Sequence, residues 1–124
     1  MKIRILGNSI RLRLTQSEVK NIAEKGKIEE RTQFGGMLNS TLIYSLEKKE
    51  TTEINADFSN NHIQVVLPEK TADEWANSNQ VGIENKIQLS DGSTFRILIE
   101  KDFKCLTERG EDESDHFPNP ADSC

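Results

Sequence analysis

Four basic side chains near the start of the chain could bind an anion. They alternate with apolar residues on either side of a Gly-Asn pair, and they are Lys2, Arg4, Arg11 and Arg13. A guanidinium group matches the oxygens of a phosphate or carboxylate with two parallel hydrogen bonds, and an ammonium group attracts the same oxygens as a point charge. If these side chains share one surface, that surface is a candidate ligand-binding site for an anionic group.

The element that must position them is a β-hairpin. Two alternating runs separated by two turn residues predict a hairpin over residues 2–14, with Gly7-Asn8 as the loop. This register pairs Ile5 with Ile10 and Arg4 with Arg11, so that the four cations lie on one side, which we call the basic face. Like charges directly opposite each other destabilise a sheet. We therefore expect an anionic ligand, a partner or the protein's own acids over this surface.

The protein's own acids are a complete alternative explanation. Glu29, Glu53, Asp57 or Glu100 on neighbouring strands could neutralise the basic face, as on many solvated sheets. The acidic tail could also fold back over it and be displaced by a partner. The sequence leaves these alternatives open.

Residues 107–124 carry six acidic residues and one basic residue, while the rest of the chain is neutral. The apolar periodicity ends near Thr107, which predicts an acidic tail that is extended or disordered. Cys105, His116 and Cys124 are zinc-ligand types, but they lack the paired short spacings of zinc motifs. We therefore expect no metal site.

No catalytic motif is present. The chain has no nucleophile elbow, no Gly-rich phosphate loop and no metalloprotease helix, and His62 falls in a predicted turn. We expect no catalytic residue and no cofactor. The alternative is a phosphohydrolase-like enzyme acting on a phosphorylated substrate in a tunnel of charged strands. That tunnel needs helices over its apolar outer faces, and two short helices cannot cover eight strands.

Length and composition bound the remaining possibilities. A chain of 124 residues with 34% hydrophobic residues suits a single domain over residues 1–106, followed by the tail. No segment approaches the ~20 apolar residues of a membrane span and no secretory signal is evident, so we expect a cytoplasmic protein without a membrane partner. The aromatic residues lie in apolar registers and the body is not basic, which argues against nucleic acid as a partner.

Capping and turn signals predict two helices. Thr15-Gln16-Ser17-Glu18 has the spacing of a capping box and Gly26 is a stop signal, so a helix is expected over about 16–25. Thr71-Ala72-Asp73-Glu74 has the same spacing and predicts a minimal helix that contains Trp75. No internal repeat is evident.

Alternation with a period of two predicts the strands. Residues 28–34 form a polar strand, and 39–47, 52–58 and 63–67 form an antiparallel meander. A last hairpin joins 83–89 to 93–100 through a three-residue loop that pairs Ile87 with Phe95. The fold class is α+β, with about eight short antiparallel strands, two short helices and the acidic C-terminal tail. Eight strands exceed the usual ~4 to 6, so we expect a strongly curled or barrel-like sheet.

Three segments carry a resemblance. They are Met1-Lys2-Ile3-Arg4-Ile5 with Gly7-Asn8-Ser9-Ile10-Arg11-Leu12-Arg13-Leu14-Thr15, then Glu100-Lys101-Asp102-Phe103-Lys104-Cys105-Leu106, and Phe117-Pro118-Asn119-Pro120. Through them the chain resembles an uncharacterised family of small bacterial proteins of unknown function. The resemblance implies a bacterial cytoplasmic protein and transfers no activity or site. From the residues themselves we expect a non-enzymatic binding or interaction module, whose partner is an anionic ligand or a protein.

Overall fold

Two β-β-α-β-β units make up the computed structural model, which describes residues 1–36, 40–104 and 114–118. In each unit a hairpin leads into a short helix, and the helix leads into a second hairpin. The first unit contains β1 (Lys2–Leu6), β2 (Ser9–Leu14), α1 (Gln16–Lys25), β3 (Lys27–Gln33) and β4 (Thr41–Lys49). The second unit contains β5 (Asn55–Ser59), β6 (His62–Pro68), α2 (Glu69–Ala76), β7 (Gly82–Gln88) and β8 (Thr94–Lys101). The prediction that the chain has no internal repeat is wrong at the level of structure.

The two units are equivalent in detail. From the first strand to the middle of the helix, each residue has a counterpart 53 positions later, because β1, β2 and α1 begin at Lys2, Ser9 and Gln16 and the matching elements begin at Asn55, His62 and Glu69. The same five positions are buried in both units. These pairs are Ile10 and Ile63, Leu12 and Val65, Leu14 and Leu67, Val19 and Ala72, and Ile22 and Trp75. The repeat is therefore one of burial pattern more than of residue identity.

Each sheet combines strands from both units. The first sheet has the order β1-β2-β8-β7 and the second has the order β3-β4-β6-β5. In both, the two central strands are parallel and each edge strand is antiparallel to its neighbour. The α+β class is confirmed. The expected antiparallel, strongly curled or barrel-like sheet is wrong, because the eight strands form two separate mixed sheets, neither of which is closed or strongly curled.

The predicted meander has the right strand directions but the wrong order, since β6 lies between β4 and β5. Burial explains the order. Ile63, Val65 and Leu67 of β6 are all buried, whereas Ala56 is only half-buried in β5 and Phe58 is exposed. The more apolar strand takes the central position, where both neighbours and the core cover it.

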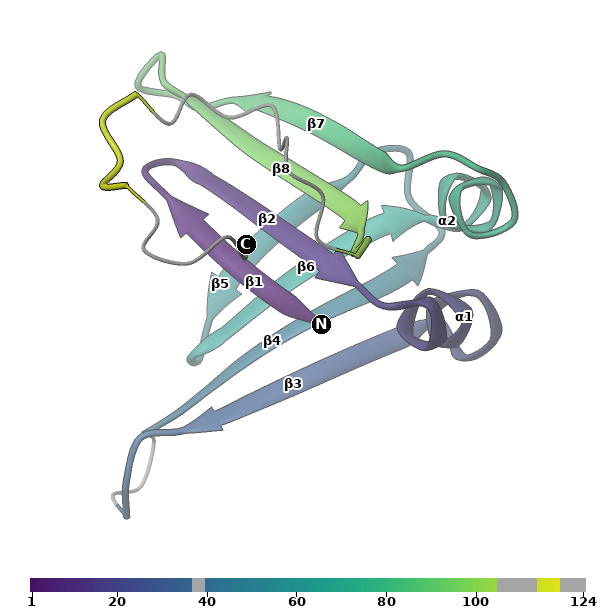
Figure 1. Cartoon of the computed structure of the whole chain (residues 1–124), viewed down its shortest axis with the longest axis horizontal. Coiled ribbons are helices and arrows are strands. Elements are labelled where there is room, and N and C mark those ends of the chain that lie inside the picture. Colours follow the sequence, from purple (N-terminus) through teal and green to yellow (C-terminus); the bar gives the residue numbers. More distant parts are fainter. Residues whose placement is uncertain (37–39, 105–113, 119–124) are drawn as a thin grey trace.

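The apolar faces of the two sheets pack against each other and against the helices. Figure 1 shows one sheet in front of the other, with strands running obliquely across, α1 and α2 together at one end and the four hairpin loops at the opposite end. The core includes Leu12 and Ile99 from the first sheet, Leu46 and Val65 from the second, and Trp75 from α2. The tunnel considered for a phosphohydrolase-like enzyme is therefore wrong, because apolar side chains and not charged ones fill the space between the sheets.

Local signals account for α1 but not for α2. Thr15 caps α1 with both hydrogen bonds of the predicted capping box, and Gly26 ends it with a positive φ of 83°. The second predicted capping box is wrong. Helix α2 begins at Glu69 after Pro68, with no side-chain cap, because the chain already turns at the end of β6.

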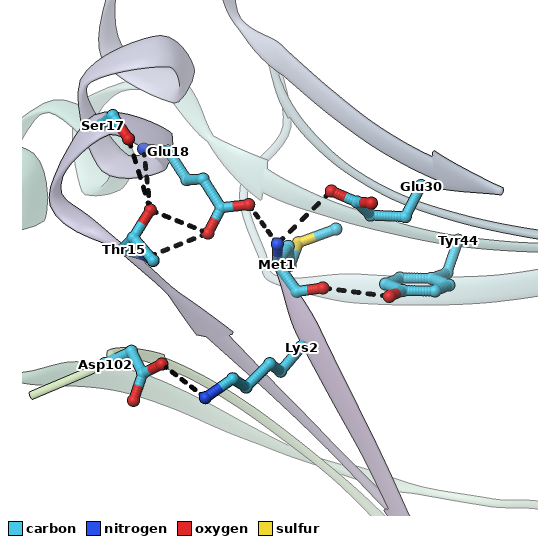
Figure 2. A network of polar contacts seen from close by, with 8 residues as sticks. All are labelled: Met1, Lys2, Thr15, Ser17, Glu18, Glu30, Tyr44 and Asp102. Atoms are coloured by element: carbon cyan, nitrogen blue, oxygen red, sulfur yellow. Dashed lines mark hydrogen bonds and ion pairs between the residues drawn. The ribbon is translucent and has the colours of Figure 1, made fainter. Parts of the chain in front are cut away.

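Polar contacts join the sheets at the two places where their edges meet. At one edge the N-terminal ammonium of Met1 binds the carboxylates of Glu18 and Glu30, and Tyr44 Oη donates a hydrogen bond of 2.9 Å to the carbonyl of Met1 (Figure 2). At the equivalent edge Asn85 Nδ2 donates to the carbonyl of Ile54 at 2.8 Å. Burial, together with the charges of Glu30 and Glu18, raises the pKa of Tyr44 above its usual range.

Candidate functional site

The hairpin forms as the sequence predicts. Gly7 supplies a positive φ of 53° in the two-residue loop, and the register pairs Ile5 with Ile10 and Arg4 with Arg11. Because side chains alternate along a strand, Lys2, Arg4, Arg11 and Arg13 all point outward from the first sheet. The predicted site residues therefore share one surface, the basic face.

The parallel pairing of β2 with β8 enlarges this surface. Its register sets Arg96 beside Ser9, Leu98 beside Arg11 and Glu100 beside Arg13. Strand β7 then adds Glu84 and Lys86 on the same side. Sequence analysis missed Arg96, because alternation shows which side of β8 it lies on but not which strand β8 will join.

Acidic side chains neutralise part of the basic face. Glu100 accepts a hydrogen bond of 2.8 Å from Arg13 Nε and lies 3.4 Å from Arg11 Nε. Lys2 Nζ lies 3.1 Å from a carboxylate oxygen of Asp102, a contact drawn as a dashed line in Figure 2. Arg4 has an interaction partner as well. Of the acids predicted as partners, Glu100 thus pairs with Arg11 and Arg13, while Lys2 pairs with Asp102, which was not among them.

Other acids considered as partners are placed elsewhere. Glu29 and Asp57 lie on strands of the second sheet, and Glu53 lies in the connection before β5. Across the described strands, the outward surface of the first sheet carries six cations against two carboxylates, with Asp102 as a third at its rim. The six are Lys2, Arg4, Arg11, Arg13, Lys86 and Arg96. On the strands that the structure describes, cations therefore outnumber carboxylates on this surface.

Arg96 on β8 and Glu84 on β7 form an ion pair on this surface. Arg96 Nη2 donates to Glu84 at 2.7 Å. This hydrogen bond, with the charge of Arg96, lowers the pKa of Glu84 below its usual range, and the same contact raises the pKa of Arg96. The pairing therefore favours the ionised form of both groups.

A hollow of about 320 Å³ lies in the basic face near the hairpin loops. Three guanidinium side chains line it, those of Arg4, Arg11 and Arg96, and we call it the arginine hollow. Its other lining residues are Leu6, Ser9, Ile10, Leu98 and His116. Arginines that converge on one concavity can donate several hydrogen bonds to the same oxyanion.

His116 is the part of the predicted tail that the structure places at this site. It belongs to the described segment 114–118, whereas Cys105, Cys124 and most of the acidic tail lie outside the described residues. Within the described ranges, no group of three or more His, Cys, Asp and Glu side chains gathers in a way that could hold a metal ion. Nor does any described helix have the length and apolar character to cross a membrane.

The equivalent surface of the second sheet is different in chemistry. The counterparts of Arg4 and Arg11 are Asp57 and Gln64, which the register of β5 and β6 pairs in the same way. His62 begins β6 instead of lying in the predicted turn, and its Nε2 is 2.7 Å from the Oγ of the buried Ser45. Since Ser45 is only 1% exposed, this pair offers no accessible nucleophile. The cationic character belongs to the first sheet.

The fold and site define an α+β sandwich of two mixed sheets with a basic outer surface on one of them. The chain matches the model described as "Family of unknown function (DUF7009)" over residues 1–121, and it belongs to this family. No curated protein and no solved structure matches the chain.

Proposed function

We propose that the protein is a binding module that holds an oxyanion of the phosphate type in the arginine hollow. The observation that carries the proposal is that Arg4, Arg11 and Arg96 line one concavity of a surface on which, over the described strands, cations outnumber carboxylates. Arg4 and Arg11 lie directly opposite each other, and repulsion between like charges placed in this way costs free energy. A bound oxyanion lowers that cost and accepts hydrogen bonds from more than one guanidinium.

The carboxylates on this surface favour binding over catalysis. The phosphohydrolase-like alternative needs acids that face the arginines and hold a metal ion. Glu84 and Glu100 are the carboxylates that the described strands bring to this surface, and each is engaged by arginine. They therefore act as counter-ions that set the strength of the positive field, which supports a non-enzymatic role.

Amide NMR titrations test the proposal directly. Inorganic phosphate and triphosphate, added at low salt, should shift the amide signals of Arg4, Ser9, Arg11 and Arg96. The shifts should weaken at moderate salt, because the cations are partly exposed and screened. Triphosphate should bind more tightly than phosphate, since it brings more charge to the same cations.

A matched pair of variants identifies the site. Arg11→Gln removes one guanidinium and inserts the residue that the second unit already has at the equivalent place, Gln64. It should weaken phosphate binding by about tenfold, the loss expected for one charge-assisted hydrogen bond of about 1.5 kcal/mol. The control is Arg31→Gln on the outer side of β3, which should leave binding unchanged. Equal binding by the Arg11 variant and the wild type would show that the hollow is not an anion site.

A further inference from the structure

The four hairpin loops lie together at the end of the molecule opposite the helices (Figure 1). We call this end of the molecule the hairpin end. Exposed apolar side chains lie in or next to each of these loops. Ile5 and Leu6 lie at the β1-β2 loop and are 59% and 64% exposed, and Phe58 at the β5-β6 loop is 67% exposed. Phe34 at the β3-β4 loop and Leu89 at the β7-β8 loop are 67% and 39% exposed.

These side chains are not the remnants of a poorly buried core. Ile5 and Phe58 occupy equivalent positions in the two units. Each is the residue nearest the hairpin turn among the side chains of β1 or β5 that face inward. The inward residues nearer the helices, such as Leu12 and Val65, are fully covered. Both units thus extend their apolar alternation past the buried core and out to the loop, where these side chains are mostly exposed.

The spacing of the apolar side chains distinguishes two kinds of partner. A protein interface needs a contiguous patch of roughly 800 Å² on each partner. At the hairpin end the apolar side chains stand on separate loops, with Asn8, Asn60, Asn61 and Ser90 in the turns between them. A membrane interface accepts such an arrangement, because isolated apolar side chains reach the acyl boundary while polar turn residues stay among hydrated headgroups.

The arginine hollow adjoins this end. Leu6, the last residue of β1 before the loop, lines the hollow, and the register aligns it with Ser9 on β2 and Arg96 on β8. An oxyanion held by Arg96 would therefore lie beside an exposed leucine. A phospholipid at a membrane surface presents a phosphate group next to apolar acyl chains.

We propose that the hairpin end docks on a membrane surface that contains anionic phospholipid, with one lipid phosphate in the arginine hollow. Leu6 and Phe58 are the apolar anchors, and Arg4, Arg11 and Arg96 are the cations that meet the headgroup. This inference rests on the proposed function and names the source of its anion. It replaces the expectation from sequence of no membrane partner, because the exposure of loop residues is a property of the folded chain.

Co-sedimentation with vesicles tests the docking. The full chain should bind vesicles of phosphatidylcholine mixed with phosphatidylglycerol and bind vesicles of phosphatidylcholine alone much less. The double variant Leu6→Ser, Phe58→Ser should bind the mixed vesicles at least roughly tenfold less, since it removes two apolar anchors. The control is Phe103→Ser, which alters an aromatic side chain of 55% exposure at the opposite end and should leave binding unchanged.

The outcomes separate this inference from the proposed function. If inorganic phosphate shifts the amides of the hollow but the mixed vesicles do not bind, the anion site stands and membrane docking is overturned. Equal vesicle binding by the double variant and the wild type also overturns it. Dissociation of a wild-type dimer by Phe58→Ser, seen in sedimentation velocity without lipid, would assign the hairpin end to a second copy of the chain instead. Absence of both phosphate and vesicle binding removes the two proposals together.

Discussion

Glu18 is the single residue that connects the most polar groups at the edge between the sheets. Its carboxylate accepts hydrogen bonds from the backbone N–H and the hydroxyl of Thr15, at 2.9 and 3.0 Å, and binds the N-terminal ammonium of Met1 (Figure 2). Burial works to raise the pKa of Glu18, but the ammonium and the Thr15 donors outweigh it, so the pKa lies below its ordinary value of 4.5. The charge of Glu18 therefore contributes to stability.

The sign of this contribution gives a pH-dependent prediction. Because the folded-state pKa is lowered, the contribution is fully present above pH 4.5 and is lost as the pH falls through the folded-state value. Glu18→Gln keeps a side chain that suits a capping box but removes the charge. We expect it to cost about 1 kcal/mol of unfolding free energy at neutral pH and little at acidic pH, measured by urea denaturation.

The control for Glu18 lies on the same helix. Glu24→Gln changes an exposed carboxylate in the last turn of α1, and it should leave the unfolding free energy within a few tenths of a kcal/mol at both pH values. A loss for Glu18→Gln that is the same at neutral and acidic pH would mean that shape and not charge is responsible.

At the scale of elements, the sequence predicts the features that depend on residues close together in the chain, such as helix ends and hairpin register. The bounds of α1, its capping box, the register of the first hairpin and the pairing of Ile87 with Phe95 are all confirmed. Each follows from signals a few residues apart: a cap, a glycine stop or a turn that fixes the register. The shared surface of the four predicted cations could therefore be foreseen.

Strand neighbours that are distant in sequence could not be predicted. The pairs β2 with β8 and β4 with β6 form because the most apolar strands take the central positions, and alternation alone ranks no strand against another. Because the pairing of β2 with β8 could not be predicted, neither the place of Arg96 on the basic face nor the arginine hollow could be predicted. The start of α2 was misplaced for a related reason, since the end of β6 and not a side-chain cap sets where that helix begins.

Equivalent strands offer a prediction with a built-in control. Glu100 of β8 and Glu47 of β4 occupy matching positions, but Glu100 faces Arg11 and Arg13 while Glu47 accepts a hydrogen bond of 3.1 Å from Gln64. Glu100→Gln leaves the cations of the basic face to repel one another. We expect it to cost about 1 kcal/mol at low salt and less at high salt, measured by thermal denaturation.

Glu47→Gln should cost less than Glu100→Gln, with a weaker dependence on salt, because its nearest cation is Lys49 at 3.9 Å. Losses of the same size and salt dependence in both variants would contradict the idea that repulsion on the basic face is the cause. A phosphate titration of the Glu100 variant gives a second readout, since the added positive charge should tighten anion binding.

For the whole molecule, the repeat escaped sequence analysis because the two units share burial and not side chains. Trp75 in the second unit is equivalent to Ile22 in the first, and Ala72 is equivalent to Val19. Helix α2 combines a larger residue, Trp75, with a smaller one, Ala72, where α1 has Ile22 and Val19. The total buried volume on the two helices therefore stays similar although the residues differ. Outward residues have diverged further, which lets one sheet be cationic and the other not.

The exchange of strands between the units makes the core indivisible. The first sheet takes β1 and β2 from one unit and β7 and β8 from the other, so neither unit can keep its sheets if its partner unfolds. We therefore expect one cooperative transition. The fluorescence of Trp75, the chain's single tryptophan, and the far-ultraviolet circular dichroism should report the same urea midpoint.

A substitution in the first unit makes this expectation sharp. Leu12→Ala, on β2, should cost about 2 to 5 kcal/mol, since the side chain is fully buried. Trp75 belongs to the second unit, yet its fluorescence midpoint should fall by as much as the dichroism midpoint. Val65→Ala, at the equivalent position of β6, should shift both probes together as well. A Leu12 variant in which Trp75 keeps its wild-type midpoint would mean that the two units unfold separately, and that strand exchange does not couple them.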